Sequence, residues 1–171
     1  EIGKAIGLHV KVMITDGSQP IGIGIGPALE AKDVLSVLKN EKDAPNALKE
    51  KSLQLAAVLL ELSGKSAIGK GYADCKTILE SGRAFQKFRA ICIAQGAFQE
   101  PGMAPIIQPV FAKSSGTVTK IDNRKLARIA KLAGAPDAPT AGIRFLAPLG
   151  RKIGAGDLLY EIHAESSGEL N

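Results

Sequence analysis

The sequence predicts an α/β segment over residues 1–100 followed by a small α+β module over residues 101–171. Up to Gly96, apolar residues recur mostly at helical spacing after one β-type run. A loop with two prolines, "AFQEPGMAP", then precedes short β-type runs separated by glycines. A chain of 171 residues can bury a core without disulfide bonds, so both parts are expected to fold by apolar packing.

The first segment is predicted to contain one strand and four helices. Residues 8–15, "LHVKVMIT", are rich in β-branched residues and lead into the turn signal "DGSQP". Pro27 suits a first helical turn, and "ALEAKDVLSVLK" then has an amphipathic pattern. A long apolar helix ends at Gly64, and two more predicted helices end at Gly82 and Gly96, since glycine favours the left-handed conformation that closes a helix.

The second segment is predicted to contain four short strands and one helix. The strands are "IQPVFAK", "GTVTKID", "GIRFLA" and "DLLYEIHA", and the helix is "NRKLARIAKLAG". The β pattern of "LGRKIGAGDLLYEI" is of the α/β-hammerhead type, which biotinyl and lipoyl carriers share. Those carriers need a modifiable lysine in a tight turn, but the chain has no Met-Lys-Met or Asp-Lys-Ala sequence. A carrier role is therefore disfavoured.

Composition argues against several classes of function. The net charge is +5, but the basic residues before residue 52 alternate with acidic ones, as on solvated helix faces, and aromatic residues are only 4%. We therefore expect no nucleic-acid partner. No apolar run approaches 18 residues, so no membrane span is expected. Cys75 and Cys92 fit no metal or redox spacing and are expected to be reduced thiols. His9 and His163 lie in predicted strands, where a lone histidine is more often structural than catalytic.

The glycine run "PIGIGIGP" does not fit a nucleotide-binding motif. Gly22, Gly24 and Gly26 give G-x-G-x-G, and Pro27 stands where the dinucleotide fingerprint continues. The stretch "SGKS" would need a glycine at position 59 to form a P-loop, and that residue is Leu59.

Two interpretations of the glycine run remain. Either it packs closely against neighbouring backbone, which its spacing favours, or its carbonyl oxygens bind a cation. In the second case, carbonyls around Ile21 and Gly24 would act with a carboxylate from Glu30 or Asp33.

The order of motifs resembles one family along almost the whole chain. These motifs are "VMITDGSQPIGIGIGPALEAKDVL", "ILESGRAFQKFRAICIAQG", "GTVTKID" and "IRFLAPLGRKIGAGDLLYEIHA". They resemble the C-terminal part of the thymidine and pyrimidine-nucleoside phosphorylases, in the branch that includes AMP phosphorylases. The resemblance implies that residues 1–100 complete an α/β phosphorylase domain and that residues 101–171 form the family's C-terminal module.

That resemblance also implies an activity for the longer parent protein. Inorganic phosphate would cleave thymidine to thymine and 2-deoxyribose 1-phosphate, and the parent would be a cytoplasmic homodimer. The alternatives are an AMP phosphorylase, giving adenine and ribose 1,5-bisphosphate, and a non-catalytic α/β-hammerhead binding module. The family's Lys-His-Ser-x-Gly-Gly phosphate stretch is absent here. The catalytic residues are therefore expected upstream, and the fragment alone is expected to be inactive.

The resemblance assigns one candidate site to this chain. Bacterial members of the family hold a structural cation with two loop carbonyls and a glutamate from the next helix. The matching positions here are Ile21, Gly24 and Asp33, with a shorter aspartate in place of the glutamate. We therefore expect a structural K⁺ or Ca²⁺ in the parent, and no cofactor for the chemistry itself.

Overall fold

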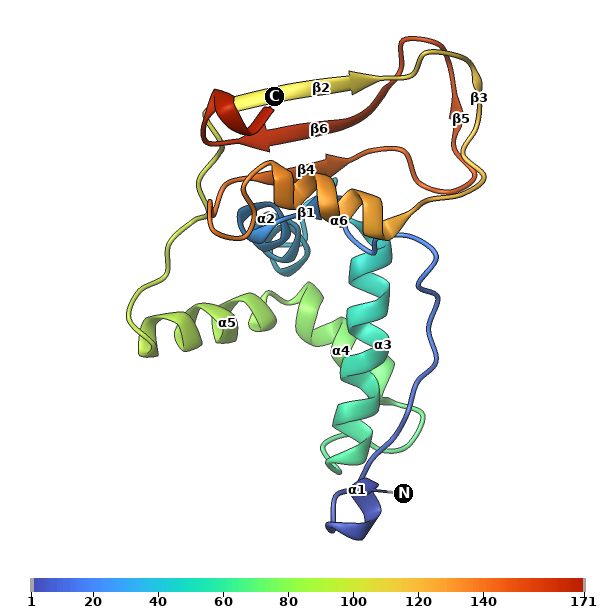
Figure 1. Cartoon of the computed structure of the whole chain (residues 1–171). Coiled ribbons are helices and arrows are strands. Elements are labelled where there is room, and N and C mark those ends of the chain that lie inside the picture. The colour runs from blue at the N-terminus through green and yellow to red at the C-terminus, as the bar shows by residue number, and fades with distance from the viewer. Residues whose placement is uncertain (1, 171) are drawn as a thin grey trace. The chain divides into compact units, whose positions relative to one another are not determined.

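The computed structural model describes residues 2–170 and shows a mixture of helices and antiparallel strands (Figure 1). The helices are α1 (Ile2–Ala5), α2 (Pro27–Leu38), α3 (Asn46–Leu62), α4 (Gly71–Glu80), α5 (Arg83–Ala94) and α6 (Asn123–Leu132), with a terminal 3₁₀ helix η1 (Ser167–Leu170). The strands are β1 (Gly24–Ile25), β2 (Ile106–Phe111), β3 (Gly116–Thr117), β4 (Gly142–Phe145), β5 (Lys152–Ile153) and β6 (Leu158–Ala164). The mixed class predicted from the sequence is confirmed.

The chain divides into two units. The helical unit contains residues 1–16 and 37–97, and the sheet unit contains residues 17–36 and 98–171. The chain passes between the units three times, at residues 17, 37 and 98, and the last of these positions is two residues before the predicted boundary at residue 100. The glycine run and most of α2 nevertheless pack with the C-terminal residues, because β1 pairs with β4.

The sheet unit is built on four strands in the order β1-β4-β6-β2, with every neighbouring pair antiparallel. Strand β6 is central and pairs with both β2 and β4, while β3 and β5 form a separate two-stranded ribbon. Strands β1 and β5 were not predicted, because a strand of two residues is too short to show an alternating pattern.

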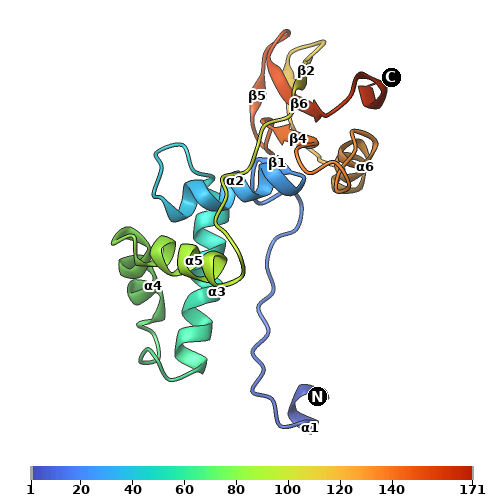
Figure 2. The same cartoon turned by 90° about the vertical axis from the view of Figure 1, so that its left-hand side faces the viewer.

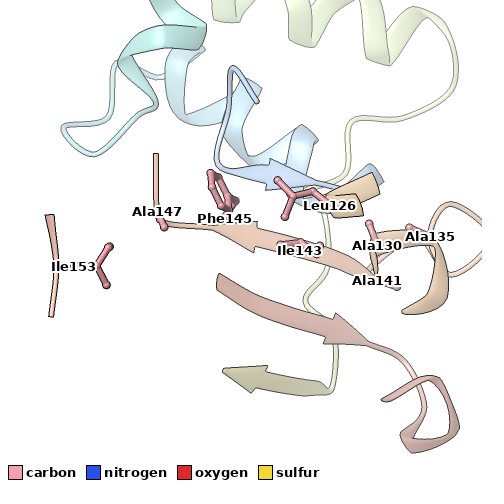
Figure 3. Packing of buried hydrophobic residues seen from close by; sticks show 8 residues of the cluster. All are labelled: Leu126, Ala130, Ala135, Ala141, Ile143, Phe145, Ala147 and Ile153. Atoms are coloured by element: carbon pink, nitrogen blue, oxygen red, sulfur yellow. The ribbon is translucent and has the colours of Figure 1, made fainter. Parts of the chain in front are cut away.

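The core of the sheet unit lies between α6 and β4. Leu126 and Ala130 of α6 pack in one apolar cluster with Ile143 and Phe145 of β4, and Figure 3 shows these side chains together. Helix α6 begins where predicted because Asp122 caps it, accepting the backbone N–H of Lys125 at 3.0 Å. Successive strand residues face opposite sides, so Arg144 points away from this cluster.

The helical unit has a second core between α3 and α4. Leu53 and Ala57 of α3 pack with Cys75 and Leu79 of α4, and Val37 completes the buried cluster. The predicted glycine ends are confirmed: Gly64 and Gly82 have φ of +70° and +76°. No helix among residues 2–170 is long and apolar enough to cross a membrane.

The strand predicted at residues 8–15 is not formed. Figure 2 shows an extended trace here, and no strand within residues 2–170 pairs with it. Its apolar side chains are exposed: 57% for Leu8, 62% for Val10, 80% for Val12 and 99% for Ile14. The residue pattern is that of a strand, but a strand also needs a partner for its backbone N–H and C=O groups.

Candidate functional site

The glycine run brings its backbone into close contact with neighbouring segments. A side chain at Gly22 would collide with the carboxylate of Asp33, and one at Gly24 would collide with the backbone of Leu29. Gly26 has a φ of +129°, which residues with a side chain rarely adopt, and a Cβ at this position would collide with the carbonyl oxygen of Ala141. The glycines therefore let the loop lie directly on α2 and beside β4, as the close-packing interpretation expects.

Asp33 holds this loop in place. Its side chain is buried, with 6% of the residue exposed. Its Oδ2 accepts the backbone N–H groups of Ile23 and Gly24, each at 2.8 Å. Burial raises the pKa of Asp33 above its usual value, and the two amide hydrogen bonds oppose that rise.

The same geometry disfavours a phosphate cradle. Gly26 donates its backbone N–H to Oε1 of Glu30 at 3.0 Å, so the amides of Ile23, Gly24 and Gly26 all point at carboxylates of this chain. An anion needs such amides free. The arrangement agrees with the sequence argument that the run does not bind phosphate.

The predicted cation ligands are only partly suited to a cation. Gly24 and Asp33 lie together, but the group of Gly24 that faces Asp33 is the amide N–H, which is not a metal ligand. Oδ2 of Asp33 already has two donors, which leaves Oδ1 as the carboxylate oxygen for a cation. Ile21 lies in the same loop, and 38% of the residue is exposed. Asp33 is satisfied by the loop itself, and the cation stays a prediction.

A polar cluster on β4 and β6 was not predicted. Arg144 lies opposite Glu161 in the strand register and donates from Nη1 to Glu161 Oε2 at 3.1 Å. His163 lies two residues further along β6, with its Nε2 3.9 Å from the same carboxylate oxygen. His163 is 4% exposed, and among residues 2–170 its Nε2 has no hydrogen-bond partner. The cross-strand pairing that joins these residues is not visible in sequence.

Burial dominates the electrostatics of His163. It lowers the pKa of the imidazole, helped by Lys32 and Arg144, while Glu161 opposes the shift. We expect His163 to be neutral at neutral pH. The structural role that its sequence position favoured agrees with this burial, whereas His9 is exposed.

Both cysteines of the chain are free thiols. Cys75 is buried in the helical unit, where desolvation raises the pKa of its thiol, and Cys92 is a second free cysteine. Within residues 2–170, no three His, Cys, Asp or Glu side chains gather as metal ligands would.

Comparison with known proteins identifies the family. The sequence model of the pyrimidine nucleoside phosphorylase C-terminal domain matches residues 117–171. A "Putative thymidine phosphorylase" of Legionella pneumophila (strain Corby) is 54% identical over 171 residues, which is 100% of this chain and 33% of that protein. The chain belongs to the thymidine and pyrimidine-nucleoside phosphorylase family and corresponds to the C-terminal part of its members. Its motif order and its mixed α/β structure agree with that membership.

Other relatives have similar coverage. "Putative thymidine phosphorylase 1" of Acidovorax sp. (strain JS42) is 50% identical over all of this chain and 34% of its own length. The "Putative thymidine phosphorylase" of Parvibaculum lavamentivorans is 48% identical over 99% of this chain and 34% of its own length. The chain described here thus spans about a third of the length of these relatives.

Proposed function

We propose that this chain is part of a longer phosphorylase, the parent, which cleaves thymidine with inorganic phosphate. The observation that carries the proposal is the match of the chain, over its full length, to relatives that bear the name "Putative thymidine phosphorylase". A phosphate oxygen would form a bond to the sugar C1′ while the bond from C1′ to the base nitrogen breaks. The bonding electrons leave with the base, which takes up a proton to give thymine, and the sugar leaves as 2-deoxyribose 1-phosphate.

The role of this chain in the parent is structural. Such a reaction needs groups that hold phosphate and stabilise a cationic sugar and a departing base. A bound phosphate would need free backbone N–H groups, but those of the glycine loop already donate hydrogen bonds to Asp33 and Glu30. We place the catalytic residues upstream, and we expect the 171-residue chain to release no base by itself.

Exposed apolar surface on the helical unit supports a longer parent. Residues 8–15 have a strand pattern without a strand partner, and Ile14 is 99% exposed. On α3, Leu59 is 64% exposed, although it lies in the middle of an apolar run. Burial of such side chains stabilises a fold, so we propose that a sheet in the parent covers them.

The deciding experiment measures release of free base. The parent is offered thymidine, uridine and AMP, each with phosphate, and the 171-residue chain is run as the control. Thymine release supports the proposal, whereas adenine release from AMP would make the parent an AMP phosphorylase. No base from any substrate would favour the non-catalytic binding module. Turnover by the control chain would contradict an upstream active site.

The structural cation is a separate proposal. A K⁺ or Ca²⁺ ion in the parent would use Asp33 with loop carbonyls near Ile21 and Gly24, because hard cations prefer oxygen ligands. Isothermal titration calorimetry of the parent and of its Asp33→Ala variant tests it. Equal heats for the two proteins, with either ion, would remove Asp33 from the ligand set.

The assembly and location of the parent are proposed from the resemblance alone. We propose a cytoplasmic homodimer that takes part in nucleoside salvage. Light scattering of the purified parent measures its mass in solution, and a monomeric mass would reject the homodimer.

A further inference from the structure

The sheet unit contains an open pocket that the proposed phosphorolysis does not use. Its volume is about 260 Å³, and it lies where α6 meets β4, β6 and the segment before α6. Leu126 and Ile129 of α6, Phe145 of β4 and Tyr160 of β6 supply apolar walls. Figure 3 shows Leu126 and Phe145 on the same side of β4. An apolar concavity with a few polar groups is the usual form of a small-molecule site.

The charged residues of the pocket favour an anion. Lys120 and Lys125 line it and are exposed, so their ammonium groups can reach a ligand at its mouth. Asp122 is the one acidic lining residue, and its Oδ1 is engaged by the backbone N–H of Lys125. Two lysines against one aspartate leave a net positive pocket.

The rest of α6 strengthens that bias. The helix NRKLARIAKL has four basic residues and no acidic one, whereas α2, α3 and α4 each carry acidic residues. None of its basic side chains forms an ion pair with a described residue. Their field therefore attracts anions toward this face of the sheet unit.

We propose that this pocket binds a small amphipathic anion: an apolar body about the size of one aromatic ring, with a carboxylate or phosphate group held by Lys120 and Lys125. The size follows from the pocket, whose volume is just below the usual range for drug-sized ligands. The apolar walls offer little to hydrogen-bond a sugar or a base edge, so apolar contact and one anionic group carry recognition. The site is separate from the glycine loop and from the polar cluster around His163.

The test is a ¹⁵N–¹H NMR titration of the 171-residue chain with three probes. These are 3-phenylpropionate, phenyl phosphate and the uncharged 3-phenyl-1-propanol. We expect saturable shifts at the amides of Val118, Ile129 and Tyr160 with dissociation constants of about 1–10 mM for the anions, as small ligands allow. The alcohol should bind about three- to tenfold more weakly than 3-phenylpropionate, because exposed charge contacts have modest energies. The tighter of the two anions identifies the natural head group.

Variants separate the pocket from the general charge of α6. The double variant Lys120→Gln/Lys125→Gln should weaken binding of 3-phenylpropionate about three- to tenfold and leave the alcohol unchanged. Arg128→Gln removes one exposed charge from the same helix outside the pocket, and it should change the affinity for 3-phenylpropionate less than about twofold. Absence of saturable shifts at the pocket, equal affinity for the alcohol, or an equal loss in Arg128→Gln would each overturn the proposal.

Discussion

Replacing Asp33 with alanine should destabilise the sheet unit, because the glycine loop depends on this carboxylate. Its Oδ2 accepts two backbone N–H groups at 2.8 Å, from Ile23 and Gly24, and alanine leaves both donors without a protein acceptor. Those residues form β1 and the turn into it, so their order is coupled to the edge of the four-stranded sheet.

The expected loss is about 2–4 kcal/mol of unfolding free energy. Hydrogen bonds to charged groups contribute about 1.5–3 kcal/mol each, and an unsatisfied buried donor costs about 1–3 kcal/mol. The expected loss stays below the sum of two such hydrogen bonds because the cost of burying the Asp33 carboxylate outweighs its amide bonds, as its raised pKa indicates. Water can also reach the half-buried amides once the side chain is gone.

Asp33→Asn is the matched control. Its amide oxygen can still accept both N–H groups while the buried charge disappears, so stability at pH 7 should change by less than about 1 kcal/mol. Because the pKa of Asp33 is raised in the folded state, the native protein holds the proton to higher pH than the unfolded chain. The free energy of unfolding should therefore fall as the pH rises from 3.8 through the folded pKa of Asp33. This pH dependence should be missing in Asp33→Asn.

Urea denaturation followed by tyrosine fluorescence measures these changes. The chain has no tryptophan and two tyrosines, Tyr72 in the helical unit and Tyr160 in the sheet unit. In a Tyr72→Phe background, the remaining signal reports the sheet unit alone. A loss below about 0.5 kcal/mol for Asp33→Ala, or an equal loss for Asp33→Asn, would refute the hydrogen-bonding role.

Two further predictions use matched pairs of variants. Leu53→Ala removes a 5% exposed side chain from the helical core and should cost about 2–4 kcal/mol, whereas Leu59→Ala, on the exposed side of the same helix, should cost less than about 0.5 kcal/mol in urea melts of this chain. Comparable losses would contradict the assigned helix face. Burial lowers the pKa of His163, so near pH 6.5 the unfolded chain takes up a proton on this imidazole while the folded protein does not. The free energy of unfolding should therefore fall as the pH drops from 6.5 toward the folded pKa. His163→Gln should remove that component and His9→Gln should not, as measured by unfolding between about pH 7.5 and pH 5; equal slopes would show that the titrating group lies elsewhere.

Much of the fold was predictable because most of its helices are long enough to show the helical repeat of apolar residues over several turns. Periodicity located α2 and α3, and glycine punctuation located their neighbours. Asp122 caps α6 immediately before Asn123, which is the first residue of the predicted helix. These are local signals, and the local structure follows them.

The parts that sequence could not supply depend on contacts between distant residues. Strand β1 forms because Gly24 pairs with Arg144, 120 positions away in a sequence where neither residue indicates the other. The polar cluster depends in the same way on the register that places Arg144 opposite Glu161. Conversely, residues 8–15 have the composition of a strand and remain unpaired, because pairing needs a second strand whatever the local preference.

The glycine loop shows that a glycine-rich turn before a helix need not bind phosphate. A G-x-G-type loop before a helix exposes amides, and an external phosphate often accepts them. Here Asp33 and Glu30, both from the helix that follows, supply the acceptors from within the chain. An internal carboxylate of this kind removes the anion site and leaves a fixed turn. The decisive feature is therefore the acid at position 33, which the glycine spacing alone does not reveal.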